Sequence, residues 1–337
     1  VIRRAVAHKK QNDIRLVDYY QYETYSRIEL QMNNLTEKFK KNKALKKLNK
    51  QIEGLQKRAN DSSEASLPVF ISETISDFYF RTSPESKKEV IKATKITGVG
   101  VEDGSVVSQF LGPSFQQFNF YENAISILNK EFISPLTSAW KINYRYILDD
   151  TVDVNGHECY EFELIPKREQ DLAFRGKIWI TTDSLAALKK VDLVINKDAN
   201  LNFIEKIHVI QEWNPTNSTP WYVAKTDITI DIESITKSAP SMRIKSSASN
   251  KNIILNKSQV SNFYEYQTEV LEDSQTHGND FWNENRHDSL SAEEKVSLAL
   301  VDSLRNLPAV RSYVDIVYFI VDGCLLYTSP SPRDKRQ

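Results

Sequence analysis

The sequence predicts an α+β fold, mainly β, in which a curved antiparallel sheet packs against a few helices. From residue 69 onward, apolar and polar residues alternate in about ten runs that short turns separate. Asn155-Gly156 lies between two such runs, and both residues tolerate the positive φ angles of a type I′ hairpin turn. Strand–helix–strand units do not recur, which disfavours a parallel sheet. Because so many twisted strands rarely stay flat, we expect a half-barrel-like meander.

Residues 1–66 are expected to form a first unit. Apolar spacing predicts a short helix over 1–12, and a strict alternation predicts a strand over 20–32 whose one apolar exception on the polar face is Tyr25. A lysine-rich amphipathic helix should follow from residue 34, with Leu45, Leu48, Ile52 and Leu55 on its apolar stripe. That stripe either packs on the protein itself or lies on an anionic membrane surface.

Residues 67–264 are expected to form the curved β domain. One inserted helix is predicted over 114–129, because Phe115, Phe118, Ile125 and Leu128 share a helical face after Gly112-Pro113. The predicted strands cover residues 69–80, 89–97, 139–148, 152–154, 157–165, 173–181, 187–195, 204–213, 221–235 and 242–255.

The end of the chain is expected to hold a polar linker and a helical pair. Residues 265–289 are polar and irregular, which indicates the linker. Residues 290–323 should form the pair, the first helix capped by Ser291 and the second starting at Pro308. The broad apolar face of the second helix suits either a soluble core or a membrane interface.

Both ends of the sequence suggest a fragment of a longer protein. The chain opens on Val1 with no signal-peptide pattern, so we expect any leader to lie upstream. Residues 324–337 resemble the translation of a sequencing adapter, and we expect them to be disordered and Cys324 not to be native.

Composition excludes several functional classes. The net charge of −1 provides no field that would attract nucleic acid. Only 9 glycines are present, which leaves little material for phosphate-binding loops, and we expect no cofactor. Each catalytic or metal motif fails on spacing or context: the glycines at 98–104, the pair His157 and Cys159, the Ser-x-x-Lys at 234–237, and the acids Asp149, Asp150 and Asp153. We therefore expect no enzyme and no metal site.

An aromatic strand face is the most informative candidate site. Alternation places large rings and aliphatic side chains on one side of two neighbouring predicted strands, with further rings at Trp179, Trp221 and Tyr222. Such a face either forms an ordinary core under helices or lines an apolar groove for acyl chains or a peptide. The predicted ligand-binding residues are Trp140, Ile142, Tyr144, Tyr146, Tyr160, Phe162, Leu164 and Trp179.

Several stretches resemble a Bacteroidetes outer-membrane family of unknown function. They are residues 160–168 (YEFELIPKR), 174–180 (FRGKIWI) and 189–203, together with 67–74, 108–112 and 313–315. The resemblance implies a carboxypeptidase-regulatory-like domain upstream, an outer-membrane β-barrel downstream, both absent here, and a periplasmic location. The pattern is also distantly similar to periplasmic lipoprotein carriers, whose curved sheet shields acyl chains.

Together these features predict a non-enzymatic periplasmic module that binds a lipid or a peptide on a concave sheet. The alternative is a structural scaffold or plug for the missing barrel, with no ligand. The expected partners are the outer membrane, through that barrel, and the lipid or peptide ligand. The sequence does not predict an oligomeric state.

Overall fold

The computed structural model describes residues 1–33, 66–98, 118–127, 130–199, 201, 203–234 and 241–304. The predicted lysine-rich helix, most of the 98–104 glycine loop, the second C-terminal helix and residues 324–337 lie outside them. The described helices are α1 Ile2–Asn12, α6 Trp140–Asn143, α7 Asn279–Asn285 and α8 Ala292–Leu304, with 3-10 turns η1 Ile14–Leu16, η2 Lys197–Ala199 and η3 Ser261–Tyr264. The strands are β1 Tyr19–Asn33, β2 Leu67–Arg81, β3 Ser86–Gly98, β4 Ala124–Ile127, β5 Lys130–Ile133, β6 Tyr144–Val154, β7 His157–Pro166, β8 Arg175–Thr181, β9 Leu188–Asn196, β10 Ile204–Pro215, β11 Trp221–Ile232, β12 Ser241–Leu255 and β13 Thr268–Val270.

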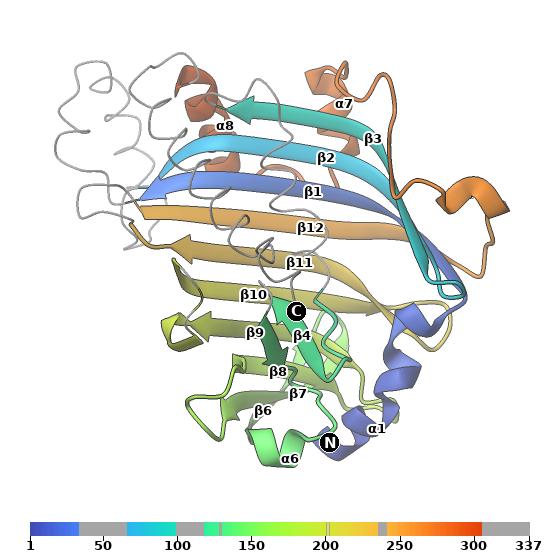
Figure 1. The fold of residues 1–337 in the computed structure, drawn as a ribbon, viewed down its shortest axis with the longest axis vertical. Coiled ribbons are helices and arrows are strands. Elements are labelled where there is room, and N and C mark those ends of the chain that lie inside the picture. Colours follow the sequence, from blue (N-terminus) through green and yellow to red (C-terminus); the bar gives the residue numbers. More distant parts are fainter. Residues whose placement is uncertain are drawn as a thin grey trace, which may run out of the picture.

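One curved, open sheet dominates the molecule (Figure 1), which confirms the predicted fold class. Its described strands run in the order β13-β3-β2-β1-β12-β11-β10-β9-β8-β7-β6, and all neighbours are antiparallel except β13 and β3. The predicted hairpin turn joins β6 to β7, with φ angles of 53° at Asn155 and 80° at Gly156. Because β1 pairs with both β2 and β12, it belongs to the same sheet as β2, β3 and β6 to β12.

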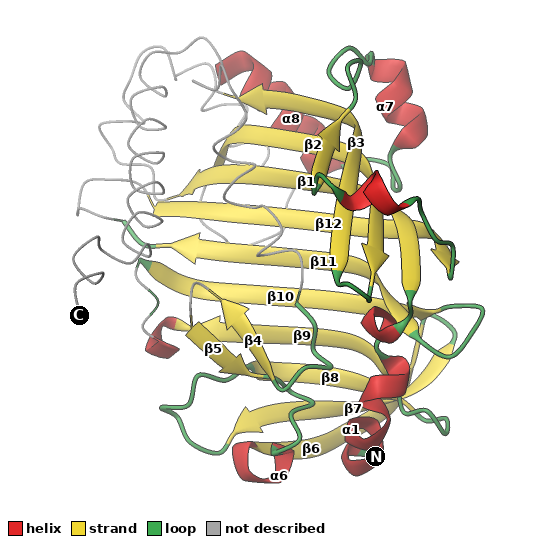
Figure 2. Cartoon of the chain, turned by 45° about the vertical axis from the view of Figure 1, so that its right-hand side comes forward, coloured by secondary structure: helices red, strands yellow, loops and turns green. Residues whose placement is uncertain are grey.

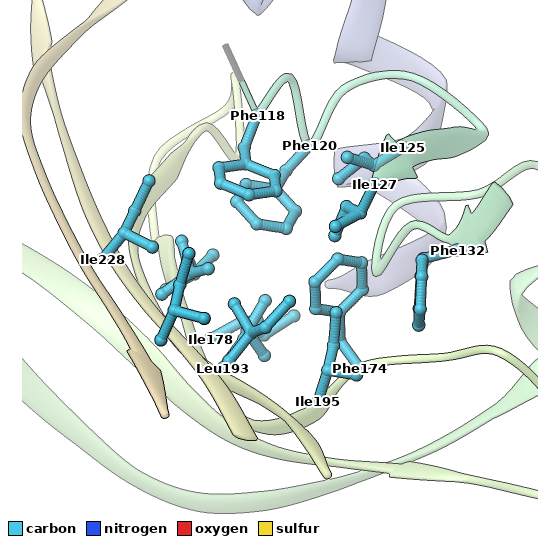
Figure 3. Packing of buried hydrophobic residues seen from close by; sticks show 14 of the residues in the cluster. Phe118, Phe120, Ile125, Ile127, Phe132, Phe174, Ile178, Leu193, Ile195 and Ile228 are labelled. Atoms are coloured by element: carbon cyan, nitrogen blue, oxygen red, sulfur yellow. The ribbon is translucent and has the colours of Figure 1, made fainter. Parts of the chain in front are cut away.

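A segment expected to be helical instead covers the concave face of the sheet. We call residues 118–127 and 130–136 the plug; its centre is the pair of strands β4 and β5, and residues 118–127, the described part of the predicted helix over 114–129, are a loop and a strand. Figure 3 shows Phe118, Phe120 and Phe132 of the plug pointing toward aliphatic side chains of β8 and β9. Phe118 and Ile125, two residues of the predicted helical face, are core residues. They reach the core from a loop and from strand β4, not from a helix.

The convex face is covered at the other end of the sheet. Residues 256–290, which we call the strap, run from β12 past the β3 edge to α7 and α8 (Figure 2). Trp282 of α7 is 1% exposed and packs against Tyr25, Ile75 and Ala93. The strap therefore packs on the sheet through Trp282 and is not the free linker expected over 265–289. Tyr25, the apolar exception on the polar face of β1, lies beneath it.

Helix α8 follows the sequence expectation closely. It begins after Ser291, whose Oγ accepts from the Glu294 amide at 3.2 Å while the Glu294 carboxylate accepts from the Ser291 amide at 2.8 Å. This reciprocal pair is a capping box, which satisfies two donors that a helix start otherwise leaves free.

Candidate functional site

Two of the predicted site residues hold the plug in place through their hydroxyl groups. The Tyr144 hydroxyl donates to the Ile133 carbonyl and accepts from the Phe174 amide at 3.1 Å. The Tyr146 hydroxyl donates to the Pro135 carbonyl at 2.6 Å. Tyr144 is 2% exposed, so the structure assigns it mainly to the attachment of the plug to the sheet.

The other predicted residues separate into three environments. Phe162 and Leu164 of β7 are buried with the core, and Tyr160 is half-buried on the same face. Trp140 and Ile142 belong to α6, not to a strand over 139–148, and Ile142 is 64% exposed. Trp179 lies on the convex face, because its β8 neighbours Ile178 and Ile180 face the concave core; its indole donates to Glu161 at 3.0 Å. The structure therefore does not bring the eight residues together on one surface.

An aromatic cleft opens in the part of the concave face that the plug leaves free. One wall comes from β1 and β2, where Tyr20 stacks on Phe80 at 4.8 Å between ring centroids and Tyr22 stacks on Phe78 at 5.0 Å. The register explains the pairs, since Tyr20 lies opposite Phe80 and Tyr22 opposite Phe78. The other aromatic residues that line the cleft come from β10, β11 and the plug, namely Trp213, Trp221, Tyr222, Phe118 and Tyr121. Of these, Tyr222 packs against the cluster that contains Tyr20 and Phe80.

Short polar side chains form the floor of this cleft. Thr24 donates to the Asn250 side chain at 2.8 Å, and Asn250 donates to the Val223 carbonyl at 2.8 Å. Gln211 donates to the Thr226 hydroxyl at 3.0 Å. These hydrogen bonds satisfy part of an uncharged polar floor, in which the buried Gln211 Oε1 has no hydrogen-bond partner among the described residues.

The cleft is small and has no net charge. Its cavity volume is about 170 Å³. The rim contains three carboxylates and three cations, which are Asp13, Glu85, Glu89, Arg15, Lys87 and Lys88. Burial raises the pKa values of the Tyr20 and Tyr22 hydroxyls well above their ordinary range, so both remain protonated. The arrangement suits an uncharged apolar group.

The candidate metal pair is explained by packing. His157 lies edge-on against the Trp221 ring at 5.1 Å, and Cys159 is fully buried. Burial raises the pKa of the Cys159 thiol to about 11, which keeps it protonated near neutral pH. No cluster of three or more His, Cys, Asp or Glu side chains that could hold a metal occurs in the part of the chain that the structure describes.

The cleft residues that the sequence did not single out had a recognisable signal. Tyr20 and Tyr22 alternate at the start of one strand, and Phe78 and Phe80 alternate at the end of another. Only the antiparallel register shows that these two ends meet. Trp221 and Tyr222, noted in the sequence as nearby rings, do line the cleft.

Comparison with known proteins identifies a family and low-level structural likenesses. A family described as a family of unknown function, DUF5686, matches residues 1–251. None of the curated proteins compared with the chain matches it. Among the described residues, no helix is both long and apolar enough to cross a membrane.

Three solved structures are similar to the chain over most of their lengths. A DUF1329 family protein from Desulfovibrio piger is 11% identical over 79% of this chain and 95% of that chain, with a TM-score of 0.29. A LolA superfamily protein from Nitrosomonas europaea is 9% identical over 77% and 96%, with a TM-score of 0.27. The MucA/MucB complex of Pseudomonas aeruginosa gives 8% identity over 76% and 98%, with a TM-score of 0.19. TM-scores this low carry no argument about function.

Proposed function

The chain belongs to the DUF5686 family of unknown function, and from this premise we propose that it is a non-enzymatic module that binds an uncharged apolar group in the aromatic cleft. The observation that supports this most is the aromatic lining, from β1, β2, β10, β11 and the plug, of an open cavity of about 170 Å³. Stacked rings above an uncharged polar floor form the kind of site that takes a mainly apolar group.

The size of the cavity sets the kind of ligand. At ~30 Å³ per water molecule, it has room for roughly six waters, which is about one bulky side chain or the end of one acyl chain. Burying such a group contributes about 2–3 kcal/mol, which alone supports only weak binding. The cleft is therefore proposed as an anchor for one part of a longer ligand, such as an exported polypeptide.

A fluorescence titration tests this proposal. The uncharged probe N-phenyl-1-naphthylamine should bind the full chain and gain fluorescence, and Phe78→Ala should weaken that binding because it removes one of the four stacked rings from β1 and β2. The matched control is Phe203→Ala, since Phe203 is 47% exposed and does not line the cleft. Equal probe binding by both variants would overturn the proposal.

Native mass spectrometry with solvent extraction identifies a natural ligand. The chain would be expressed in a periplasm and examined for a co-purified molecule. A stoichiometric lipid or peptide that Phe78→Ala loses would support the cleft. A ligand-free mass for the wild-type chain would favour the second candidate below.

The location is also proposed. The family resemblance at 160–168 and 174–180 supports a periplasmic position at the outer membrane of a Bacteroidetes cell, where an absent downstream barrel would attach the module. Fractionation of cells that express the native gene tests this, and recovery of the chain in the cytoplasm would overturn it.

A second candidate function is a scaffold for that barrel with no ligand. The observation that favours it is the plug, which fills the concave face over β8 and β9 (Figure 3). A scaffold predicts that cleft variants leave barrel assembly unchanged while variants that release the plug impair it.

A further inference from the structure

A second groove lies where α6 and the edge strand β6 meet the first turn of α1. This edge groove has a volume of about 660 Å³, within the ~300–1,000 Å³ range of ligand pockets. Its apolar surface comes from Trp140, Tyr144, Tyr146, Leu148 and Phe162. Four of these were predicted to bind a ligand, and they meet here, next to the attachment of the plug.

All charged side chains that line the edge groove are cations. They are Arg3, Lys141, Arg145 and Lys167, and neither an aspartate nor a glutamate lines it. Within the described ranges, none of the four forms an ion pair with a carboxylate. The rim of the aromatic cleft, by contrast, balances three cations with three carboxylates.

The cations are close to the apolar surface and still exposed to solvent. The Lys141 ammonium lies 5.6 Å from the centroid of the Trp140 ring, and Lys167 donates to the Lys141 carbonyl. Leu148 is 54% exposed at the rim, and the neighbouring Ile142 is 64% exposed. Large exposed aliphatic side chains beside unpaired cations are typical of surfaces that meet an amphipathic anion.

We propose that the edge groove binds a single acyl chain that carries an anionic head group. The chain lies along Trp140, Tyr146 and Leu148, and the head group pairs with Lys141, Arg145 and Lys167. The charge pattern selects this ligand, because an uncharged chain would leave the cations unused and a cationic amphiphile would be repelled. The site is separate from the aromatic cleft and goes beyond the function proposed for it.

Quenching by nitroxide-labelled stearate, kept below its micelle concentration, tests the position of the chain. The label should quench part of the tryptophan fluorescence of the full chain, and Trp140→Phe should remove most of the quenchable fraction. Unlabelled stearate should compete, and stearyl alcohol should compete at least about tenfold less well. Quenching that persists in Trp140→Phe, or equal competition by the alcohol, would overturn the proposal.

A charge variant tests the head-group contacts. Substituting Lys141, Arg145 and Lys167 by Gln should weaken stearate binding by about tenfold or more, since each cation near the anionic head group contributes to the attraction. The matched control substitutes Lys206, Lys257 and Lys295, which are exposed and outside the groove, and should bind as the wild type does. Unchanged binding by the first variant would contradict the proposal.

A comparison with and without lipid vesicles distinguishes binding of a single molecule from binding to a membrane surface. We expect monomeric stearate to bind in the absence of vesicles, and Phe78→Ala to leave that binding unchanged. Binding only to vesicles of anionic phospholipid, with none to monomeric stearate, would overturn the single-molecule site.

Discussion

Tyr144 shows how one hydroxyl can connect two layers. It is a donor to the plug through Ile133 and an acceptor from Phe174, which lies just before β8. Burial raises its pKa above the ordinary tyrosine range, so the donor proton is retained. The strand face that the sequence predicted as a ligand groove therefore includes Tyr144, a residue that attaches the plug to the sheet.

We expect Tyr144→Phe to lower the free energy of unfolding by about 1–3 kcal/mol, because it leaves a buried amide and a buried carbonyl without a partner. Urea titration measures the change. Hydrogen exchange should also become faster at the Phe174 amide, which loses its acceptor. The control is Tyr160→Phe, since Tyr160 lies on the same face and its hydroxyl has no hydrogen bond among the described residues. Equal effects of the two variants would contradict this role.

Glu73 is the centre of a buried ion pair on the convex face. It is 1% exposed and accepts from Arg286 at 2.6 and 2.9 Å and from the Tyr25 hydroxyl at 2.7 Å. Burial alone would raise its pKa, but the hydrogen bonds from Arg286 and Tyr25 outweigh burial and lower it. A carboxyl whose folded pKa is depressed stabilises the fold above its unfolded pKa, and that stability is lost as the pH falls through the folded value.

Glu73→Gln should cost about 3–5 kcal/mol at neutral pH, because Arg286 would stay buried without a counter-charge. Below the unfolded carboxyl pKa of about 4.3, the wild type should lose stability more steeply than the variant. Urea titrations between pH 7 and pH 3 measure both effects. Glu265→Gln, an exposed carboxylate in the strap, controls for simple removal of charge. Parallel pH profiles for the wild type and Glu73→Gln would refute the assignment.

At the scale of elements, the strap depends on α7. Its seven residues bring Trp282 and Arg286 to the convex face, where they cover Tyr25 and Glu73. The short parallel strand β13 pairs with β3 through only three residues. The most deeply buried contact of the strap therefore comes from α7, while η3 adds ring contacts to β2 and β3 through Phe263 and Tyr264.

Trp282→Ala should destabilise the chain by about 3–5 kcal/mol and speed hydrogen exchange over residues 279–285 before the rest of the sheet is affected. Tyr266→Ala, which changes a 67% exposed ring in the same strap, should do neither. Exchange that rises uniformly over the sheet and the strap would show that α7 is not a separate local unit.

Elements that depend on a local sequence pattern were predictable. Elements whose conformation depends on tertiary packing were not. The alternation in β1, β7 and β10 gave their positions within a few residues, and Ser291 marked the start of α8. The alternation of apolar and polar residues begins at Trp140 and Ile142, in α6, before β6 starts. The alternation alone therefore placed these two residues wrongly on a strand. The spacing of Phe118 and Ile125 matched a helical face, but the spacing reflects only that both residues are buried, and a loop and a strand bury them equally well. The aromatic cleft required the β1–β2 register, which no single segment contains.

At the scale of the whole molecule, β1 joins two meanders into one sheet. Strands β2 and β3 lie on one side of it and β12 to β6 on the other. The expected division at residue 66 would separate β1 from both of its neighbours. The sheet should therefore behave as one cooperative unit.

We expect urea unfolding to give coincident transitions by tryptophan fluorescence, whose reporters lie outside β1, and by hydrogen exchange of the β1 amides. The physical reason is that β1 contributes hydrogen bonds to both flanks of the sheet. An earlier loss of β1 protection, with fluorescence unchanged, would instead support an independent unit at 1–66.

The central place of β1 also bears on how the protein is made. Tyr20 pairs with Leu255, and Asn33 pairs with Ser241, so one flank of this strand stays vacant until nearly all of the sheet has been synthesised. Contacts this distant along the chain slow folding and leave apolar strand edges open to aggregation. A chain that is delivered from its N-terminus would thus present its aromatic first strand, with Tyr20 and Tyr22, long before that strand has a partner. The interval between the synthesis of β1 and that of β12 is therefore the period in which this strand is most open to aggregation.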